Sequence, residues 1–344
     1  GDGSSGAPFA TYAKALSTVK GAIADGVAIV ILCKAATNLY TPVATRRILV
    51  GTGSLWIQGE FNQLQTGTAD SGTPTTLTHS GAFAGKSYSG KMLYISSGTG
   101  AGQYRVILSH TNNTLTVVGR FGTTPDSTSV YQVLDWGTKF SGTASWYLGD
   151  VTLQNISSTN VAASAFIRPY SGSRVNFTRC SFMHSGVGTT IYCAEMGAYV
   201  YMGACVFDGA TVAYRALRVY APGIQGHMYQ TLIKRYVFGG GCTVNISGNG
   251  SEVSIRNGSY LDGRDGSGPV VYVFGGASLL YYSNIVNGAI DKITIIGDSE
   301  NTYGLYADMR GFCPYSQAVY ITFSGSFSVA NYGVDDASYA YIRP

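Results

Sequence analysis

The stretch Val175-Asn-Phe-Thr-Arg-Cys-Ser-Phe182 returns in related form as Val200-Tyr-Met-Gly-Ala-Cys-Val-Phe207. Related blocks open at Val151-Thr-Leu153 with Ile156, at Val253-Ser-Ile255 and at Leu279-Leu-Tyr281. Neighbouring copies are about 24–26 residues apart, a step typical of solenoid repeats. Alternating apolar positions inside each block indicate strands, and stacked strands bury a core that one strand alone cannot bury. The blocks therefore predict an elongated parallel β-solenoid whose long lateral face is its working surface.

The composition suits such a rod. Only 12% of the 344 residues are charged, against roughly 25% in a typical globular protein. The chain contains 46 Gly and 26 Tyr, and its hydrophobic share of 45% excludes a disordered chain. The net charge of +4 is small and the basic residues are scattered. This pattern argues against a nucleic-acid partner, which favours a dense basic stripe.

The cysteines and histidines give no sign of a metal site. The six cysteines form no C-x-x-C pair, so they are predicted to be buried small hydrophobes. Cys180 and Cys205 occupy the same place in successive blocks and are expected to stack without bonding. The four histidines are dispersed and no Asp-x-Asp-x-Asp loop occurs, so neither a metal nor another cofactor is expected.

The start of the chain carries no targeting signal. It begins Gly-Asp-Gly without Met and shows no signal peptide. We therefore expect a fragment or processed product, with an anchoring segment upstream. No apolar run reaches about 18 residues, so membrane insertion is not expected.

The pattern predicts three regions. Residues 1–61 form a cap and the first coils, residues 62–137 form an inserted small β domain, and residues 138–344 form the main β-helix. A helix is expected over residues 9–25, with an apolar stripe and Gly26 as its stop. The stripe consists of Tyr12, Leu16, Val19 and Ile23.

The inserted region breaks the coil period. Short alternating strands, separated by Gly-rich or Asn-Asn turns, run through Gly90–Leu108, Asn112–Val118 and Ser129–Leu134. Such spacing predicts a small antiparallel β module.

Two parts of the sequence resemble known proteins. The N-terminal helix, the strand Val27–Leu32 and the segment Gly51-Thr-Gly-Ser-Leu-Trp-Ile-Gln-Gly59 resemble the opening of right-handed parallel β-helix proteins of the pectate-lyase and phage-tailspike type. The turn Ser97-Gly-Thr-Gly-Ala-Gly-Gln103, with the strand and Thr123–Tyr131 tail that follow, is similar to a small β domain of bacteriophage structural proteins. The resemblance implies an all-β, right-handed parallel β-helix protein of a phage virion, on the tail or capsid surface. It would be made in the bacterial cytoplasm, assemble as a homotrimer and join other virion proteins through the upstream segment.

Cleavage of a glycan by hydrolysis would need two carboxylates around the scissile bond. The candidate acids are Glu195, Asp208, Asp262 and Asp265. The Asp262–Ser267 stretch has an alternative interpretation as a Gly-rich coil corner with solvated charges. No G-x-S-x-G elbow occurs, so a serine nucleophile is not expected.

Tyrosine offers an apolar face to a sugar ring and a hydroxyl to its edge. Tyrosines and other aromatics cluster in two stretches, which include Tyr192, Tyr199, Tyr201, Tyr214, Tyr220, Tyr272, Phe274, Tyr281 and Tyr282. The predicted glycan-binding residues are Tyr199, Tyr201, Arg215, Arg264, Tyr281 and Tyr282. The alternative is that half of the aromatics point inward or into a subunit interface.

Three functions remain open at this point. We favour a virion spike or fibre that recognises host surface polysaccharide, because acids are scarce and none forms a convincing pair. The alternatives are a glycan depolymerase, hydrolase or lyase, and a non-enzymatic structural decoration of the capsid or tail.

Overall fold

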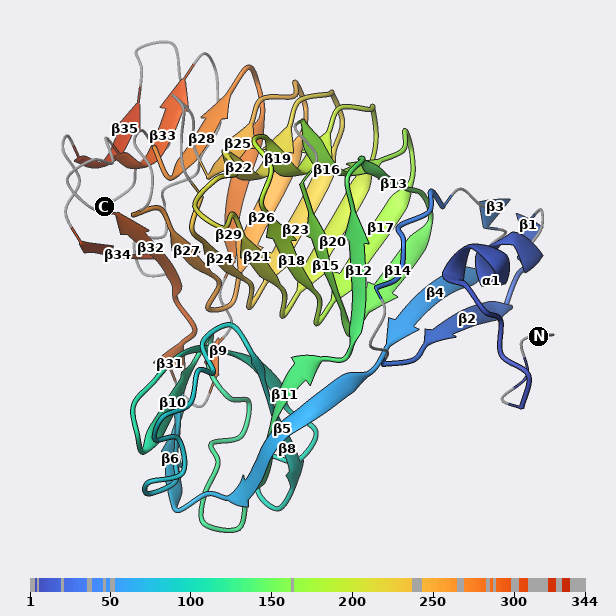
Figure 1. Ribbon diagram of the computed structural model, residues 1–344. Coiled ribbons are helices and arrows are strands. Elements are labelled where there is room, and N and C mark those ends of the chain that lie inside the picture. The colour runs from blue at the N-terminus through green and yellow to red at the C-terminus, as the bar shows by residue number, and fades with distance from the viewer. Residues whose placement is uncertain are drawn as a thin grey trace.

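Three parallel sheets wrap around one long core, and an antiparallel sheet lies beside them (Figure 1). The computed structural model describes residues 4, 6–19, 22–35, 39–45, 48–49, 53–161, 164–236, 243–264, 269–282, 285–286, 289–297, 303–308, 321–325 and 330–334.

Each of the three parallel sheets contains eight strands. The first sheet holds, in spatial order, β2 (Ala28–Cys33), β4 (Ser54–Gly59), β14 (Val151–Gln154), β17 (Arg174–Thr178), β20 (Tyr199–Gly203), β23 (Gln225–Tyr229), β26 (Glu252–Arg256) and β29 (Ser278–Tyr282). The second holds β12 (Thr138–Gly142), β15 (Ile156–Asn160), β18 (Ser181–His184), β21 (Val206–Asp208), β24 (Leu232–Lys234), β27 (Tyr260–Asp262), β32 (Ile293–Gly297) and β34 (Ile321–Gly325). The third holds β13 (Trp146–Leu148), β16 (Ala165–Pro169), β19 (Thr189–Cys193), β22 (Arg215–Val219), β25 (Val244–Ile246), β28 (Val271–Phe274), β33 (Tyr303–Asp308) and β35 (Ala330–Val334).

Neighbouring strands in these sheets run parallel, which confirms the predicted β-solenoid. Equivalent apolar residues of the repeated block stack in register: Val175 pairs with Val200, and Phe177 with Met202. All four side chains are buried. Burial of each such side chain stabilises the fold by about 1.5–3 kcal/mol relative to exposure.

A non-glycine residue with positive φ lies at the corner between the first sheet and the second in each of five successive coils. These residues are Asn155, Arg179, Ala204, Gln230 and Asn257, with φ between 41° and 56°. A buried thiol or hydroxyl follows the turn in several coils. Cys180 and Cys205 occupy this place, are fully buried and carry free thiols, so their predicted unbonded stack is confirmed.

Helix α1 (Tyr12–Thr18) is shorter than the expected helix over residues 9–25. Thr11 caps its first turn by accepting a hydrogen bond from the Lys14 backbone N–H. The Ser17 and Thr18 hydroxyls donate back to backbone carbonyls near the other end, a local competition that disfavours continuation of a helix. Ile23 therefore lies in β1 (Ala22–Ile23), which pairs in parallel with β3 (Ile48–Leu49).

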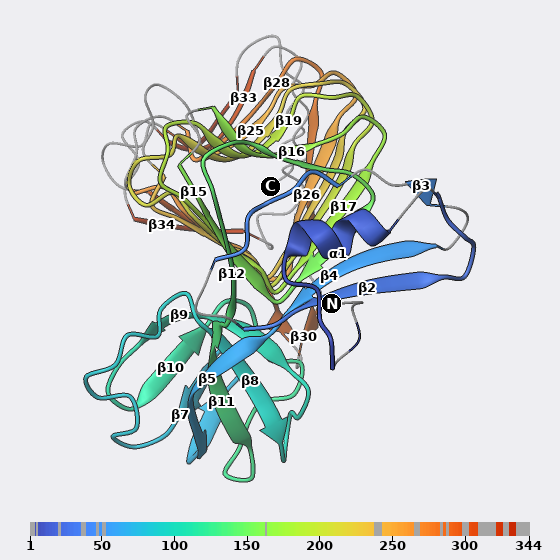
Figure 2. The same cartoon turned by 45° about the vertical axis from the view of Figure 1, so that its right-hand side comes forward.

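The helix nevertheless closes the end of the core, as expected. Tyr12 and Leu16 are buried, and the Tyr12 ring packs edge-on against Phe140 with 5.2 Å between ring centroids. Figure 2 shows α1 at the N-terminal end of the coil stack, beside strands β2 and β4. No helix within the described ranges is long and apolar enough to cross a membrane.

The antiparallel sheet lies between β4 and β12 in the sequence. Its spatial order is β5 (Phe61–Thr68), β11 (Val130–Trp136), β8 (Met92–Ser97), β9 (Tyr104–His110), β10 (Thr114–Val117), β7 (Thr76–Thr78) and β6 (Ser71–Thr73). The expected antiparallel pairing of this region is confirmed, while the domain boundaries at residues 62 and 137 stay a prediction. A short antiparallel pair, β30 (Ile285–Val286) and β31 (Ala289–Ile290), interrupts the later coils.

The antiparallel sheet covers the outer face of the second sheet. Met92, Val106 and Trp136 form one buried cluster with Val206 and Leu232 of the coils. In Figures 1 and 2 the third sheet lies on the opposite side of the stack from this contact. The outer face of the third sheet is therefore left uncovered by the antiparallel sheet.

Candidate functional site

One outward-facing column of the third sheet alternates tyrosine and arginine. Tyr147 pairs with Arg168, and Tyr192 pairs with Arg218. The pairing of Ile167 with Ile191 places Arg168 beside Tyr192, so the four residues follow one another across β13, β16, β19 and β22. The column continues through Asn245, Tyr272 and Tyr306. We call these seven residues the Tyr–Arg row.

The guanidinium groups of this row lie close to the tyrosine rings. The Arg168 Cζ is 5.9 Å from the ring centroid of Tyr147 and 5.4 Å from that of Tyr192. The Arg218 Cζ is 5.4 Å from Tyr192 and 5.2 Å from Tyr220. These are cation–π distances, each contributing about 0.5–1 kcal/mol at exposed sites. The contacts fix the rings and the cations relative to one another before any ligand arrives.

A second set of aromatic rings widens the same face. Tyr170 lies 5.7 Å from Tyr147, and Tyr220 lies 6.5 Å from Tyr192, measured between ring centroids. Tyr220 is 55% exposed, so its ring is open to solvent. Further along, Tyr272 stacks on both Phe274 and Tyr306. The face therefore offers a run of ring surfaces along the axis of the stack.

The two arginines retain hydrogen-bonding capacity. The Nε atoms of Arg168 and Arg218 are buried and have no hydrogen-bond partner. Within the described part of the chain, neither arginine forms a salt bridge with an acid. Arginine presents donors in a planar fork that matches a carboxylate. The face can therefore combine ring stacking with the binding of hydroxyls or anions.

The predicted residues Tyr199 and Tyr201 lie on a different face, the outer surface of the first sheet. There the Arg174 Cζ is 4.6 Å from the Tyr199 ring centroid, and Tyr199 and His227 are 5.2 Å apart. Burial lowers the pKa of His227, and the nearby Arg256 and Arg174 guanidinium groups lower it further. This face is also cationic.

His227 belongs to a small hydrogen-bonded network on that face. Its Nδ1 is hydrogen-bonded to the Ser254 hydroxyl, which also accepts a bond of 3.0 Å from Arg256 Nε. Ser254 is 0% exposed. A polymer in solvent cannot reach its hydroxyl, so the network does not form an accessible nucleophile.

Two of the predicted acids are neutralised by neighbouring arginines. Asp208 is buried and accepts hydrogen bonds from Arg235 Nε at 2.7 Å and Nη2 at 2.5 Å. The Lys234 Nζ is 3.7 Å from the same carboxylate. Asp262 accepts bonds of 2.8 and 2.6 Å from Arg264 Nε and Nη2. Both acids end strands of the second sheet.

Glu195 does not join either of these acid–arginine pairs. Glu195 is exposed at the corner between β19 and β20, where the third sheet passes to the first. Asp208 lies at another corner, where the second sheet passes to the third. Asp265 falls outside the described residues, as do the side chains of Tyr281 and Tyr282. The catalytic roles of the four acids stay a prediction.

The predicted glycan-binding residues are spread over all three sheets. Arg215 opens β22 on the third sheet, and its Nε is buried without a hydrogen-bond partner. Arg264 follows β27 of the second sheet, whereas Tyr281 and Tyr282 end β29 of the first. Sequence reasoning missed Tyr147, Arg168 and Arg218. Arg168 lies one coil before Tyr192 and Arg218 lies one coil after it. The repeat spacing could therefore have pointed from Tyr192 to both arginines.

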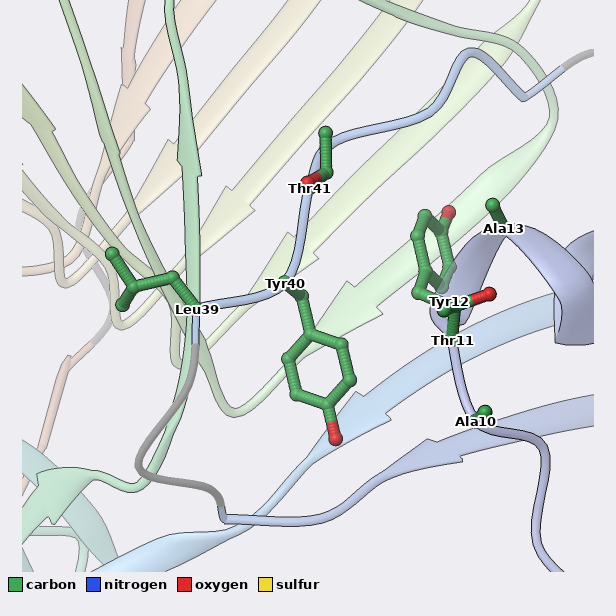
Figure 3. Close-up of a pocket in the computed structure, with 7 residues that line it drawn as sticks. All are labelled: Ala10, Thr11, Tyr12, Ala13, Leu39, Tyr40 and Thr41. Atoms are coloured by element: carbon green, nitrogen blue, oxygen red, sulfur yellow. The ribbon is translucent and has the colours of Figure 1, made fainter.

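A pocket of about 390 Å³ lies at the N-terminal end of the stack (Figure 3). It is lined by Ala10, Thr11, Tyr12, Ala13, Leu39, Tyr40 and Thr41. Tyr12 and Tyr40 both pack against Phe140, and the Tyr40 hydroxyl donates to the Lys34 carbonyl. The lining contains no Asp, Glu, His, Cys, Lys or Arg side chain. Across the described ranges, no three His, Cys, Asp or Glu side chains gather as a metal site.

Comparison with known proteins gives matches only among solved structures. No family model matches the sequence, and no curated protein matches it. The tailspike gp49 from Pseudomonas phage LKA1 is similar at 13% identity and a TM-score of 0.26, over 95% of this chain and 71% of that one. The gp54 tailspike of Acinetobacter baumannii bacteriophage AP22, solved with A. baumannii capsular saccharide, is similar at 12% identity and a TM-score of 0.24, over 91% and 62%. The tailspike gp61 of Pseudomonas phage phi297 is similar at 14% identity and a TM-score of 0.20, over 97% and 68%. The parallel β-solenoid itself rests on the strand pairing described above.

Proposed function

We propose that this chain is a phage virion surface protein that binds host surface polysaccharide along the Tyr–Arg row. The alternation of Tyr147, Arg168, Tyr192 and Arg218 over four neighbouring strands is the observation that carries the proposal. Parallel strands are about 4.8 Å apart, so chemically similar groups recur at short, even steps along the axis. A polymer of repeating sugars, laid along that axis, meets the same surface chemistry again at every second strand.

The chemistry of the row fits sugars. A tyrosine ring can stack on the apolar face of a sugar, while its hydroxyl bonds to the ring substituents. The neighbouring guanidinium groups can bond to hydroxyls or carboxylates at the edge of the polymer. The rings already lie against the arginines, so little ordering is needed on binding, and preorganisation of this kind improves affinity.

We also propose a homotrimer, the state implied by the sequence resemblance. A closed cyclic assembly would pack rods side by side without forming fibres. Light scattering of the purified chain at micromolar concentration measures this directly. A monomer would contradict the trimer and leave the proposed binding face unaffected.

The binding face is tested with two pairs of matched variants. Tyr192→Ala and Arg168→Ala change the third sheet, while Tyr199→Ala and Arg174→Ala change the equivalent tyrosine–arginine contact on the first sheet. Truncation of a central aromatic anchor costs about 2 kcal/mol or more of binding free energy. We therefore expect the first pair to weaken binding to host-envelope polysaccharide by at least about tenfold, and the second pair to have little effect. The reverse result would move the site to the first sheet.

Incubation of the protein with host-envelope polysaccharide also distinguishes binding from cleavage. The length of the polymer is followed with time, for the wild type and for Glu195→Gln, Asp208→Asn, Asp262→Asn and Asp265→Asn. Shortening that is lost in one of these variants would favour the depolymerase. Binding without shortening supports the recognition protein. Absence of binding to every host polysaccharide would leave the purely structural function.

A further inference from the structure

Among the described residues, no acid pairs with the arginines of the Tyr–Arg row. Arg168, Arg215 and Arg218 all lie on the third sheet, and within the described residues none of them forms a salt bridge. All three have a buried Nε atom without a hydrogen-bond partner. By contrast, Arg235 and Arg264 are each held by a carboxylate of the chain. Arginine is thus left available on the third sheet and neutralised on the second.

The spacing of the charges is set by the coils. One strand, carrying Tyr192, separates the strands of Arg168 and Arg218. Two strand spacings amount to about 10 Å. The positive charges of Arg168 and Arg218 therefore lie on alternate strands, with the Tyr192 ring on the strand between them.

We propose that the polysaccharide bound by the Tyr–Arg row is acidic, with a carboxylate on alternate sugars. This inference rests on the proposed function. Arg168 and Arg218 each bind one carboxylate through their guanidinium donors. The Tyr192 ring, which lies between the two guanidinium groups, contacts the sugar between the carboxylates through its edge and hydroxyl. Arg215 adds positive charge at the edge of the same sheet. A neutral polymer would contact the tyrosines but leave the two guanidinium charges without a counter-ion.

A chemically matched pair of polymers tests the charge. Hyaluronan carries a carboxylate on every second sugar, and its carboxyl-reduced form keeps the backbone without the charge. We expect the wild type to bind hyaluronan at least tenfold more tightly than the reduced polymer, and the difference to shrink as salt is raised. Polygalacturonate, with a carboxylate on every sugar, tests the alternation and is expected to bind more weakly than hyaluronan.

Variants connect this preference to the two arginines. Arg168→Ala and Arg218→Ala are each expected to weaken hyaluronan binding about tenfold, because a hydrogen bond to a charged group contributes that much. Binding of the reduced polymer should change less than about twofold. Arg168→Lys keeps the charge and loses the planar fork, so its affinity for hyaluronan should lie between those of the wild type and Arg168→Ala. Arg174→Ala, on the first sheet, is the control and should leave both affinities unchanged. Thermal unfolding of each variant excludes loss of fold.

The outcomes separate the two proposals. Equal binding of hyaluronan and its reduced form would overturn the acidic specificity and leave polysaccharide binding intact. Tighter binding of polygalacturonate than of hyaluronan would overturn the alternation alone. If neither hyaluronan nor its reduced form binds while host-envelope polysaccharide does, the alternating acidic specificity fails and polysaccharide binding stands. Preferential binding of a single-stranded oligodeoxynucleotide, which also uses rings and cations, would assign the row to nucleic acid and overturn the inference.

Discussion

The Trp136 indole Nε1 donates a hydrogen bond of 2.7 Å to the backbone carbonyl of Arg179. Trp136 is the last residue of β11 in the antiparallel sheet, whereas Arg179 is the positive-φ residue at a corner of the coils. The Arg179 side chain lies over the Tyr104 ring at 4.6 Å, and its Nε donates to the Asn155 side chain. One corner residue therefore links two neighbouring coils to the antiparallel sheet.

Trp136→Phe should loosen this attachment. The substitution keeps an aromatic ring but leaves the Arg179 carbonyl without its donor, at a cost of about 1–3 kcal/mol. Urea unfolding followed by circular dichroism measures the loss, and limited proteolysis shows whether the 62–137 region is released. Trp56→Phe is the control, because the Trp56 indole donates to the Ser54 hydroxyl two residues away. Equal effects of the two substitutions would contradict a special role for Trp136.

Arg235→Ala should destabilise the coils although Arg235 is not part of the Tyr–Arg row. It removes the bidentate partner of Asp208, whose side chain is 7% exposed. An unpaired buried charge is costly, and we expect a loss of about 1–3 kcal/mol in the free energy of unfolding. Lys34→Ala breaks the exposed pair with Glu60 and should cost less than about 1 kcal/mol. An unchanged urea midpoint for Arg235→Ala would argue against a structural role for the pair.

The buried thiols should be unreactive in the folded protein. Burial raises the pKa of Cys33 and of Cys193 to about 12, and burial also raises the pKa of Cys205. Since the thiolate is the reactive form, alkylation by iodoacetamide near pH 8 should spare these residues until urea unfolds the chain. Mass spectrometry of the peptides assigns the modification residue by residue. Rapid native labelling of Cys193 would contradict its burial in the core.

The repeated block made the solenoid predictable because stacked coils place equivalent residues over one another. Val175 and Val200, or Cys180 and Cys205, could be paired from the sequence alone. The coil of Gln225–Tyr229 was harder to detect. There Gly226 occupies the inward position between Val200 and Val253, so the apolar signal is missing although the strand is regular.

The binding face was less predictable because the coil step changes. The positive-φ corners at residues 155, 179, 204, 230 and 257 are separated by 24, 25, 26 and 27 residues in turn. A column on another sheet cannot be followed by adding a constant. Local clusters such as Tyr199 with Tyr201 are conspicuous in the sequence, whereas Tyr147, Arg168 and Arg218 are scattered along it and are brought into one column by the register of the third sheet.

A buried carboxylate lies where the antiparallel sheet meets a later coil. Asp291 is 2% exposed, and its Oδ2 has no hydrogen-bond partner. Gly119 and Gly258, both with positive φ, pass so close that a Cβ on Gly258 would lie 2.3 Å from the Gly119 Cα and 2.5 Å from the Asp291 carboxylate. Burial raises the pKa of Asp291, although the Arg120 backbone and the Gln230 side chain act in the opposite direction.

The sign of the resulting pH dependence follows from this raised pKa. The folded state favours protonated Asp291, so the stability that this group contributes is fully present below its unfolded pKa. That stability is lost as the pH rises through the folded pKa. Asp291→Asn, which cannot ionise, should therefore melt at a higher temperature than the wild type near pH 7. The difference should vanish below about pH 4, where the aspartate is protonated in both states.

Asp126 provides the opposite case within the same chain. Its carboxylate accepts hydrogen bonds from the Thr128 hydroxyl and backbone N–H, which lower the pKa of Asp126. The stability that Asp126 contributes is present above its unfolded pKa and lost as the pH falls through the folded one. Asp126→Asn should therefore lower the melting temperature near pH 7 and approach the wild type in acid. Calorimetry of both variants from acid to pH 7 measures whether each substitution raises or lowers the melting temperature. If Asp291→Asn lowers the melting temperature at pH 7, as Asp126→Asn is expected to do, burial does not control the ionisation of Asp291.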